Sequence, residues 1–400
     1  MAESGTLEGG HEKEMHVTSK GARMPGRVQT VSLTCSLLVG LAPAGAAFAN
    51  VGPKTAIAAT KQEHHSGKVD KSFRRVKIGL TDGVSSGASV TLNSDNNLTL
   101  IANAGAWRDL GTSAQVLRIG TNGGLLDADF EVPPEMAETI KLAEQTGLGS
   151  PWHAQPDGSV LIMTPVALMR LTSTGAVDAG FTSPALGKGD VFLGLASANA
   201  GRFWVMTLAS TGGETLMRIN GDGSIDKSFA PLKVRGVGGY PITGTGYEDA
   251  LAYDGRVLRR IRVDGSIDPS FSYKRQNLGV ERLPGGRTLL EWNKDPRRVS
   301  HLAVLKPNGS VDRSFRFRNP DKLWVNKIIA QGRNLVVQGS EAGVRPRLFR
   351  IRANGSVDRT FHAPRMWVDD WAIQSDGRIV VAGRDAENPK TKPGFVIRLL

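Results

Sequence analysis

The chain has 400 residues, contains 48 glycines and carries a formal net charge of +12. The glycines, about 12% of residues against the usual ~7%, are spread along the chain, which is typical of short strands joined by tight turns. Residues 1–49 hold four basic and four acidic side chains, so the positive excess lies in the body that follows. A basic body favours anionic partners such as acidic glycans, nucleic acid or phospholipid headgroups, although solubility alone also accounts for such a charge.

The first segment has the composition of an export signal. Two arginines precede an apolar stretch that ends in Ala47-Phe48-Ala49, an A-x-A-like cleavage site. We therefore predict a signal peptide at residues 1–49, with Met1 or Met24 as the start, and an exported protein that is periplasmic or extracellular. The alternative is a transmembrane anchor, but the stretch is weakly apolar and contains Gly, Ser, Thr and Pro.

The single cysteine, Cys35, lies inside this leader. Cleavage would leave a chain without cysteine, which excludes disulfides, thiolate catalysis and cysteine-based zinc sites. Residues 50–66 are polar and rich in turn-forming residues, and we expect a flexible lead-in there. Residues 67–400 remain for the folded domain.

One phrase is repeated along this domain. The stretch NGDGSIDKSF, which ends at Phe229, is one of seven related copies, each with an aromatic residue preceded three residues earlier by an aspartate. The aromatics are Phe73, Phe130, Phe181, Phe229, Phe271, Phe315 and Phe361, and the aspartates are Asp70, Asp127, Asp178, Asp226, Asp268, Asp312 and Asp358. Successive aromatics are 42–57 residues apart, close to the period of about 40–50 residues of a four-stranded propeller blade.

A second phrase precedes the first in most units. A short strand runs into an Asp-Gly or Gly-Arg turn and an apolar strand leaves it, as expected for a hairpin. Copies of this hairpin lie at 154–163, 283–292, 330–339 and 373–383, with a looser one at 92–102. Each unit is thus predicted to contain strands A and B, a variable loop, strand C, a tight turn and a strand D that ends in the phenylalanine. The unit at 230–271 lacks a clear apolar B strand and departs most from this pattern.

The two ends of the domain complement each other. Residues 67–73 supply a D strand without a preceding C strand, and residues 394–400 supply a C strand without a following D strand. Joining them would close a ring and remove free sheet edges. We therefore predict an all-β fold, a seven-bladed β-propeller of four-stranded blades whose ring is closed by the N-terminal D strand and the C-terminal C strand.

On the phrases RINGDGSIDKSF and IQSDGRIVVAG, the chain resembles the delta-60 repeat family, bacterial exported β-propellers of uncharacterised function. The resemblance covers about residues 67–400. It implies the propeller fold and says little about activity.

The repeated aspartates allow two interpretations. Asn220, Asp222, Ser224 and Asp226 alternate as oxygen donors do in calcium loops, with Gly223 permitting the turn. However, no bidentate glutamate stands at a fixed offset, and other copies replace Asp222 by Asn or Thr. We favour a structural role in which the aspartate accepts backbone N–H bonds and the phenylalanine fills the gap between blades. We predict no metal and no cofactor.

Binding on such a scaffold is expected in the variable D–A and B–C connections. The predicted ligand-binding residues are Trp152, Trp324, Trp367, Trp371, Arg297 and Arg298. The tryptophans precede the predicted A strands, where their rings could stack on a sugar or base, or could pack between blades instead. Basic residues such as Arg74, Arg75 and Lys77 are assigned to the same connections. Asp369 and Asp370 lie between two tryptophans, but adjacent residues on a strand point to opposite faces and make a poor acid/base pair.

No catalytic motif supports an enzyme directly. The sequence holds no G-x-S-x-G elbow, no P-loop and no histidines at metal-ligand spacing. We predict a non-catalytic binding module, monomeric, whose partner is an anionic glycan or a cell-surface protein, with no specific nucleic-acid motif. The alternatives are a propeller enzyme acting on polysaccharide, such as a glycosidase or lyase, and a structural component of the cell surface. An enzyme would bring carboxylates from separate blades together near the channel mouth.

Overall fold

The computed structural model describes residues 66–81, 84–85, 88–102, 116–127, 130, 133, 152–234, 249–254, 257–274, 279–293, 299–319, 322–340, 347–385 and 394–400. The predicted signal peptide and nearly all of the lead-in lie outside these residues. Within them, the regular elements are β-strands and two short 3-10 turns, η2 (Asn199–Gly201) and η3 (Pro284–Gly286). No helix in the described part is long and apolar enough to cross a membrane.

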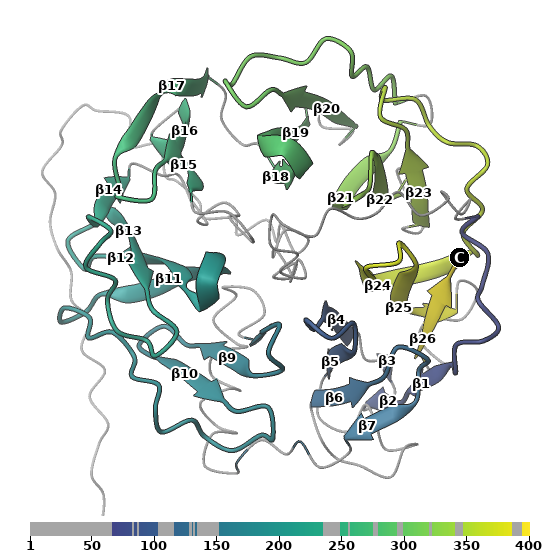
Figure 1. Cartoon of the computed structure of the whole chain (residues 1–400), viewed down its shortest axis with the longest axis horizontal. Helices are drawn as coiled ribbons and strands as arrows, with labels where there is room; N and C mark the ends of the chain where they lie inside the picture. Colours follow the sequence, from purple (N-terminus) through teal and green to yellow (C-terminus); the bar gives the residue numbers. More distant parts are fainter. Residues whose placement is uncertain are drawn as a thin grey trace, which may run out of the picture. The chain divides into compact units, whose positions relative to one another are not determined.

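The strands form small antiparallel sheets (Figure 1), so the all-β prediction is confirmed. Three sheets have four strands each: β4 (Ala88–Leu92), β5 (Leu98–Ala102), β6 (Val116–Ile119) and β7 (Leu125–Asp127); β11 (Val191–Ser197), β12 (Phe203–Leu208), β13 (Glu214–Ile219) and β14 (Leu232–Val234); and β24 (Met366–Ile373), β25 (Ile379–Asp385), β26 (Gly394–Leu399) and β1 (Val76–Ile78).

The other sheets are smaller in the described part of the chain. They comprise β8 (Trp152–Ala154), β9 (Val160–Met163) and β10 (Leu168–Leu171); β15 (Ala250–Asp254), β16 (Val257–Ile261) and β17 (Ile267–Lys274); β18 (Gly279–Leu283), β19 (Arg287–Asn293) and β20 (Ser300–Leu305); β21 (Trp324–Gln331), β22 (Asn334–Ser340) and β23 (Arg347–Ile351); and the pair β2 (Leu80–Thr81) and β3 (Val84–Ser85).

The predicted A–B hairpins are present. The turn between β24 and β25 is closed by Gln374 N–H donating to the Arg378 carbonyl, and the turn between β8 and β9 repeats this with Gln155 and Ser159. The irregular unit does contain a B strand, β15, whose Ala250, Leu251 and Ala252 are buried. Small apolar side chains thus replace the larger ones that the sequence pattern favoured.

The predicted end of strand D is wrong. The apolar residue before the aspartate makes only an isolated bridge, such as Ile219 with Ile225, and the chain then turns, with Phe229 N–H donating to the Asp226 carbonyl. The outermost strands β1 and β14 begin after the phenylalanine, and only β17 runs through it. The phenylalanine anchors a turn because its ring is drawn inward, where Phe229 and Phe271 are buried.

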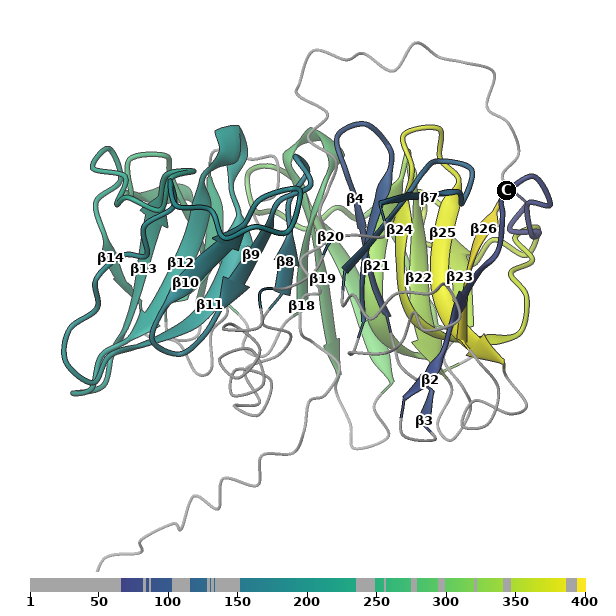
Figure 2. The same ribbon diagram turned by 90° about the horizontal axis from the view of Figure 1, so that it is seen from below.

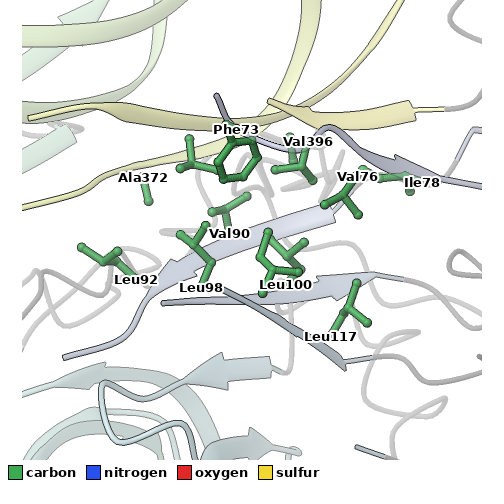
Figure 3. Packing of buried hydrophobic residues seen from close by; sticks show 13 residues of the cluster. Phe73, Val76, Ile78, Val90, Leu92, Leu98, Leu100, Leu117, Ala372 and Val396 are labelled. Carbon is green, nitrogen blue, oxygen red and sulfur yellow. The ribbon is translucent and has the colours of Figure 1, made fainter. Parts of the chain in front are cut away.

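Both ends of the described chain belong to one sheet. β1 pairs antiparallel with β26, with Val76 opposite Val396, and Gly67 N–H donates to the Leu400 carbonyl. β24 of this sheet lies beside β4 of the first sheet (Figure 1). The core between the two sheets contains Phe73, Val90 and Val396 (Figure 3). Burial of these apolar side chains stabilises the contact between the first and last sheets.

Candidate functional site

The repeated aspartate is the centre of a clamp. Asp226 Oδ1 accepts hydrogen bonds from the Ser228 backbone N–H and hydroxyl, at 2.9 and 2.6 Å. Its Oδ2 accepts from Arg218 Nε at 2.7 Å, and the Arg218 guanidinium lies 5.3 Å from the centre of the Phe229 ring. Burial alone would raise the pKa of Asp226, but the bonds from Ser228 and the charge of Arg218 hold it well below its usual value.

The same arrangement recurs in other copies. Each contains an arginine on strand C paired with the aspartate and placed about 5 Å from the phenylalanine ring; the sets are Arg170–Asp178–Phe181, Arg260–Asp268–Phe271, Arg350–Asp358–Phe361 and Arg398–Asp70–Phe73. The structural interpretation of the aspartate is therefore confirmed. The described residues contain no group of three His, Cys, Asp or Glu side chains placed to hold a metal ion.

Sequence reasoning missed the arginine. It stands eight residues before the aspartate in four of the five sets, in the C-strand segments LMRL, LMRI, LRRI and LFRI, which the sequence showed only as apolar strands. In the fifth set, Arg398 reaches Asp70 across the pairing of the two chain ends. The constant spacing was the available signal.

Backbone hydrogen bonds also join successive copies of the repeat. The residue after the phenylalanine donates its N–H to the turn of the next copy, as Thr182 does to Asp222 and Ala230 does to Asp264. His362, after the last phenylalanine, donates to Ser66, which occupies the equivalent turn position at the start of the described chain. Two features of this contact require glycine in the turn. Gly223 has φ +85°, and a Cβ there would collide with the Thr182 carbonyl.

The four predicted tryptophans fall into two pairs. Trp152 and Trp371 each stand three residues before the glutamine that opens the A–B turn, and both are buried, Trp371 completely. Trp324 and Trp367 each stand seven residues before that glutamine, at the variable-loop end of neighbouring sheets, and both are partly exposed. Trp324 and Trp367 are the pair that can offer a ring surface to a ligand, whereas the other two pack in the core.

Charged groups surround the exposed pair. Arg384, opposite Trp367 in the strand register, places its guanidinium 5.8 Å from the Trp367 ring and binds Asp369 through Nε and Nη2 at 2.5–3.1 Å. Burial raises the pKa of Asp369 to about 6 in spite of Arg384. On the neighbouring sheet, the exposed Arg347 lies at the start of β23, beside the strand end that pairs with Trp324.

Asp370 has different partners from Asp369, as expected for adjacent strand residues. Lys327 Nζ of β21 donates to Asp370 Oδ1 at 2.5 Å, and Asp370 Oδ2 accepts from the backbone N–H of Val90 at 2.8 Å and from the Ser89 hydroxyl at 3.2 Å. This carboxylate therefore joins three neighbouring sheets through β21, β24 and β4. Removing it would leave the Lys327 ammonium without its closest counter-charge.

A second carboxylate lies on the next sheet along. Burial raises the pKa of Glu281 on β18 to about 8, and the charge of Lys327 opposes this shift only partly. Glu281 Oε1 has no hydrogen-bond partner within the described structure. A protonated carboxyl near a lysine can donate or accept a proton close to neutral pH.

The histidine on β8 is perturbed in the opposite direction. Burial lowers the pKa of His153 to about 4, so this histidine is neutral near pH 7.

The basic residues are placed less uniformly than the sequence suggested. Arg297 and Arg298 lie outside the described residues. The assignment of Arg74, Arg75 and Lys77 to a variable connection is wrong, because Arg74 N–H bonds the Asn122 carbonyl of a tight turn and Lys77 belongs to β1. Arg74 therefore lies beside a tight turn, whereas Lys77 pairs with Phe395 near the start of β26 and the Arg75 guanidinium lies 3.9 Å from the centre of the Phe395 ring.

Three other basic residues do lie where a strand A begins. Lys188, Lys322 and Arg365 are exposed on the segments that lead into β11, β21 and β24. None of the three forms an ion pair with another described residue. These three exposed cations give the variable-loop end a positive bias.

Comparisons with known proteins add little to this geometry. No family model matches the sequence, and no curated protein matches it either. Among solved structures, the β-propeller domain of the Trilobed protease from Pyrococcus furiosus is 8% identical over 76% of this chain and 93% of that one, with a TM-score of 0.48. The RRP9 WD40 repeats are 10% identical over 83% and 100%, with a TM-score of 0.47.

Puromycin hydrolase is 15% identical over 75% of this chain and 50% of its own length, with a TM-score of 0.46. The chain thus spans about half the length of that enzyme. At such identities and scores, none of these likenesses supports an inference about activity.

Proposed function

We propose that the chain is an exported seven-bladed β-propeller that binds an anionic ligand, such as an acidic glycan, at its variable-loop end. The ring closure rests on the sheet shared by β1 and β26 and on the hydrogen bond from His362 to Ser66, which repeats the bond between other successive copies. The export rests on the leader at residues 1–49.

The binding proposal is carried by one observation. Two equivalent, partly exposed tryptophans, Trp324 and Trp367, stand at the same end of neighbouring sheets as Lys322, Arg365 and Arg384. Aromatic faces stack on sugar rings, and guanidinium groups bind carboxylates and sulfates with charge-assisted hydrogen bonds. Such a pairing suits an acidic polysaccharide better than a neutral one.

A heparin column tests the charge requirement. We expect the chain to be retained at low salt and released at moderate salt, since screening weakens contacts between exposed charges. Arg365→Ala should lower the salt needed for elution, whereas Arg313→Ala, on an exposed arginine of the tight-turn side, should leave it nearly unchanged. No retention at low salt, or equal effects of the two variants, would contradict the proposal.

A glycan array tests the ligand class. We expect acidic glycans to bind and Trp367→Ala to weaken that binding about tenfold, as for an aromatic group central to an interface. Binding to neutral glycans with equal strength would contradict an anionic ligand.

The alternative is a propeller enzyme acting on polysaccharide. It is favoured by Glu281, Lys327 and Asp370, which stand on three neighbouring sheets, with the pKa of Glu281 raised to about 8 by burial. Release of new reducing ends or unsaturated products from an acidic polysaccharide, abolished by Glu281→Gln, would establish this activity and displace the binding module.

A further inference from the structure

A polar cavity lies at the other end of the sheets from Trp324 and Trp367. It has a volume of about 300 Å³ and is lined by Asn96, Thr121, Asn122, Gln374, Ser375, Asp376, Arg378 and Arg398. Gln374 to Arg378 form the β24–β25 turn, at the other end of β24 from Trp367. Seven residues of strand separate Trp367 from Gln374, a distance of about 23 Å at ~3.3 Å per residue. The cavity is therefore distinct from the variable-loop site.

The cavity is built where the first and last sheets meet. The β4–β5 turn and the β24–β25 turn lie at the same end of their sheets (Figure 2). Asn96 has φ +63°, a left-handed conformation, and its Oδ1 accepts the Ser375 N–H at 3.1 Å while its carbonyl accepts from Gln374 Nε2. Arg398 contributes a hydrogen bond from Nη1 to the Thr121 carbonyl. These bonds fix the walls from both ends of the described chain.

The two arginines of the lining differ in how closely carboxylates pair with them. Arg398 is almost fully buried and binds Asp70 at 2.8 Å through both Nε and Nη2. Arg378 is one-third exposed, and its nearest carboxylate atoms lie 3.6 Å away in Asp376 and 3.9 Å away in Asp70. These distances exceed those of N–H···O hydrogen bonds, about 2.7–3.2 Å. Within the described residues, the Arg378 guanidinium therefore has donors that no carboxylate fully occupies.

The rest of the lining suits hydroxyl groups. Asn122, Thr121 and Ser375 are exposed side chains that both donate and accept hydrogen bonds, and the Asp376 carboxylate accepts them. The lining contains no aromatic or aliphatic side chain. A volume of about 300 Å³ lies at the lower limit of small-molecule pockets, which run from about 300 to 1,000 Å³.

We propose that this cavity binds a small hydroxylated carboxylate of the size of one sugar acid. The Arg378 guanidinium receives the carboxylate, and the amide and hydroxyl side chains receive the ligand's hydroxyls. Because the walls come from the first and last sheets, the bound ligand also holds the two ends of the chain together. This site goes beyond the proposed function, so either can fail without the other.

The test compares sodium glucuronate with glucose on the full chain by isothermal titration calorimetry. We expect glucuronate to bind and glucose to produce no heat, because glucose has the hydroxyls without the carboxylate. Glucuronate at saturating concentration should raise the melting temperature by about 2–5 °C, since a ligand that binds only the folded state stabilises it.

Two variants remove the charge complementarity. Arg378→Ala deletes the receiving guanidinium, and Asn122→Asp places a negative charge in the lining. The second variant preserves the turn, because Asn122 Oδ1 accepts the Gly124 N–H as Asp222 Oδ1 accepts the Ser224 N–H in another copy. We expect each variant to weaken glucuronate binding at least tenfold.

Asn308→Asp is the matched control. Asn308 occupies the same turn position in another copy, where its Oδ1 accepts the Ser310 N–H, and it lies outside the cavity lining. This variant and Trp367→Ala should both leave glucuronate binding unchanged. The proposal is overturned if glucuronate does not bind, if glucose binds equally well, if Asn308→Asp weakens binding as much as Asn122→Asp, or if Trp367→Ala abolishes it.

Discussion

The arginine–aspartate clamp makes a strong prediction, because one copy of the repeat lacks the arginine. We consider Asp226→Asn, which keeps the side-chain shape and the Oδ1 acceptor for Ser228 but removes the charge. Arg218, 1% exposed at its side chain, then has no carboxylate at Nε, and Arg202 also loses its contact with Asp226 at 3.3 Å. Removing one partner of a buried ion pair destabilises a protein by about 3–5 kcal/mol.

Asp312→Asn is the matched control. Asp312 Oδ1 accepts the Ser314 N–H and hydroxyl as Asp226 does with Ser228, but the residue eight positions earlier is Val304. The asparagine keeps the turn and leaves no buried arginine unpaired. We expect this control to lose about 1 kcal/mol or less, the usual range for one hydrogen bond with modest charge.

Urea unfolding followed by tryptophan fluorescence measures both variants. The difference of about 3 kcal/mol should also appear in calorimetry as a melting temperature about 4 °C lower for Asp226→Asn than for Asp312→Asn, on the entropy of unfolding expected for some 330 residues. Equal destabilisation of the two variants would refute the reasoning, because it would mean that the aspartate acts only through its turn.

Other predictions concern the turns and the titrating groups. In urea unfolding, Gly223→Ala should lower the free energy of unfolding by about 2 kcal/mol or more beyond the loss caused by Gly212→Ala. Both glycines have positive φ, but only a Cβ at Gly223 would collide with the Thr182 carbonyl. Equal losses in the two variants would mean that backbone strain alone accounts for the effect. Glu281 has a pKa raised from 4.5 to about 8, so its contribution to stability is present below pH 4.5 and is lost as the pH rises to 8. The free energy of unfolding of Glu281→Gln should therefore equal that of the parent at pH 4.5 and exceed it at pH 8 by at most about 5 kcal/mol, at 1.36 kcal/mol per pKa unit. A parent protein whose free energy of unfolding does not change between these pH values would contradict the assignment. The clamp aspartates Asp70, Asp226, Asp268 and Asp358 have lowered pKa values, so the stability they contribute is present above pH 4 and is lost as the pH falls below it, which acid titration followed by circular dichroism should show as cooperative unfolding.

The sequence predicts the repeating framework because the same local contacts recur in each copy. A spacing of three residues between aspartate and phenylalanine is enough to indicate a turn, and the hairpin phrases predict the A–B pairs. Sequence alone placed the phenylalanine at the end of strand D, however, since an apolar residue inside a turn and one inside a strand have the same pattern.

The candidate site was harder to predict. Trp371 and Trp367 are four residues apart on one strand, yet one is buried and the other is partly exposed, because a bulge between Val368 and Asp370 shifts the alternation of faces. The arginine of the first clamp, Arg398, is 328 residues from Asp70 and has no local signal. Contacts that depend on the register between distant segments leave no local sequence pattern from which they could be predicted.

The central claim is that the two ends of the domain close one ring, and a cross-link tests it most directly. Lys77 of β1 faces Phe395 of β26 in the strand register, and the only cysteine of the sequence, Cys35, lies in the predicted signal peptide. In a chain that also carries Cys35→Ser, the pair Lys77→Cys and Phe395→Cys should oxidise to one intramolecular disulfide and raise the melting temperature, because the bond closes a very long loop of the unfolded chain. Two free thiols after mild oxidation of the folded protein, or disulfide formation only between molecules, would contradict the closure.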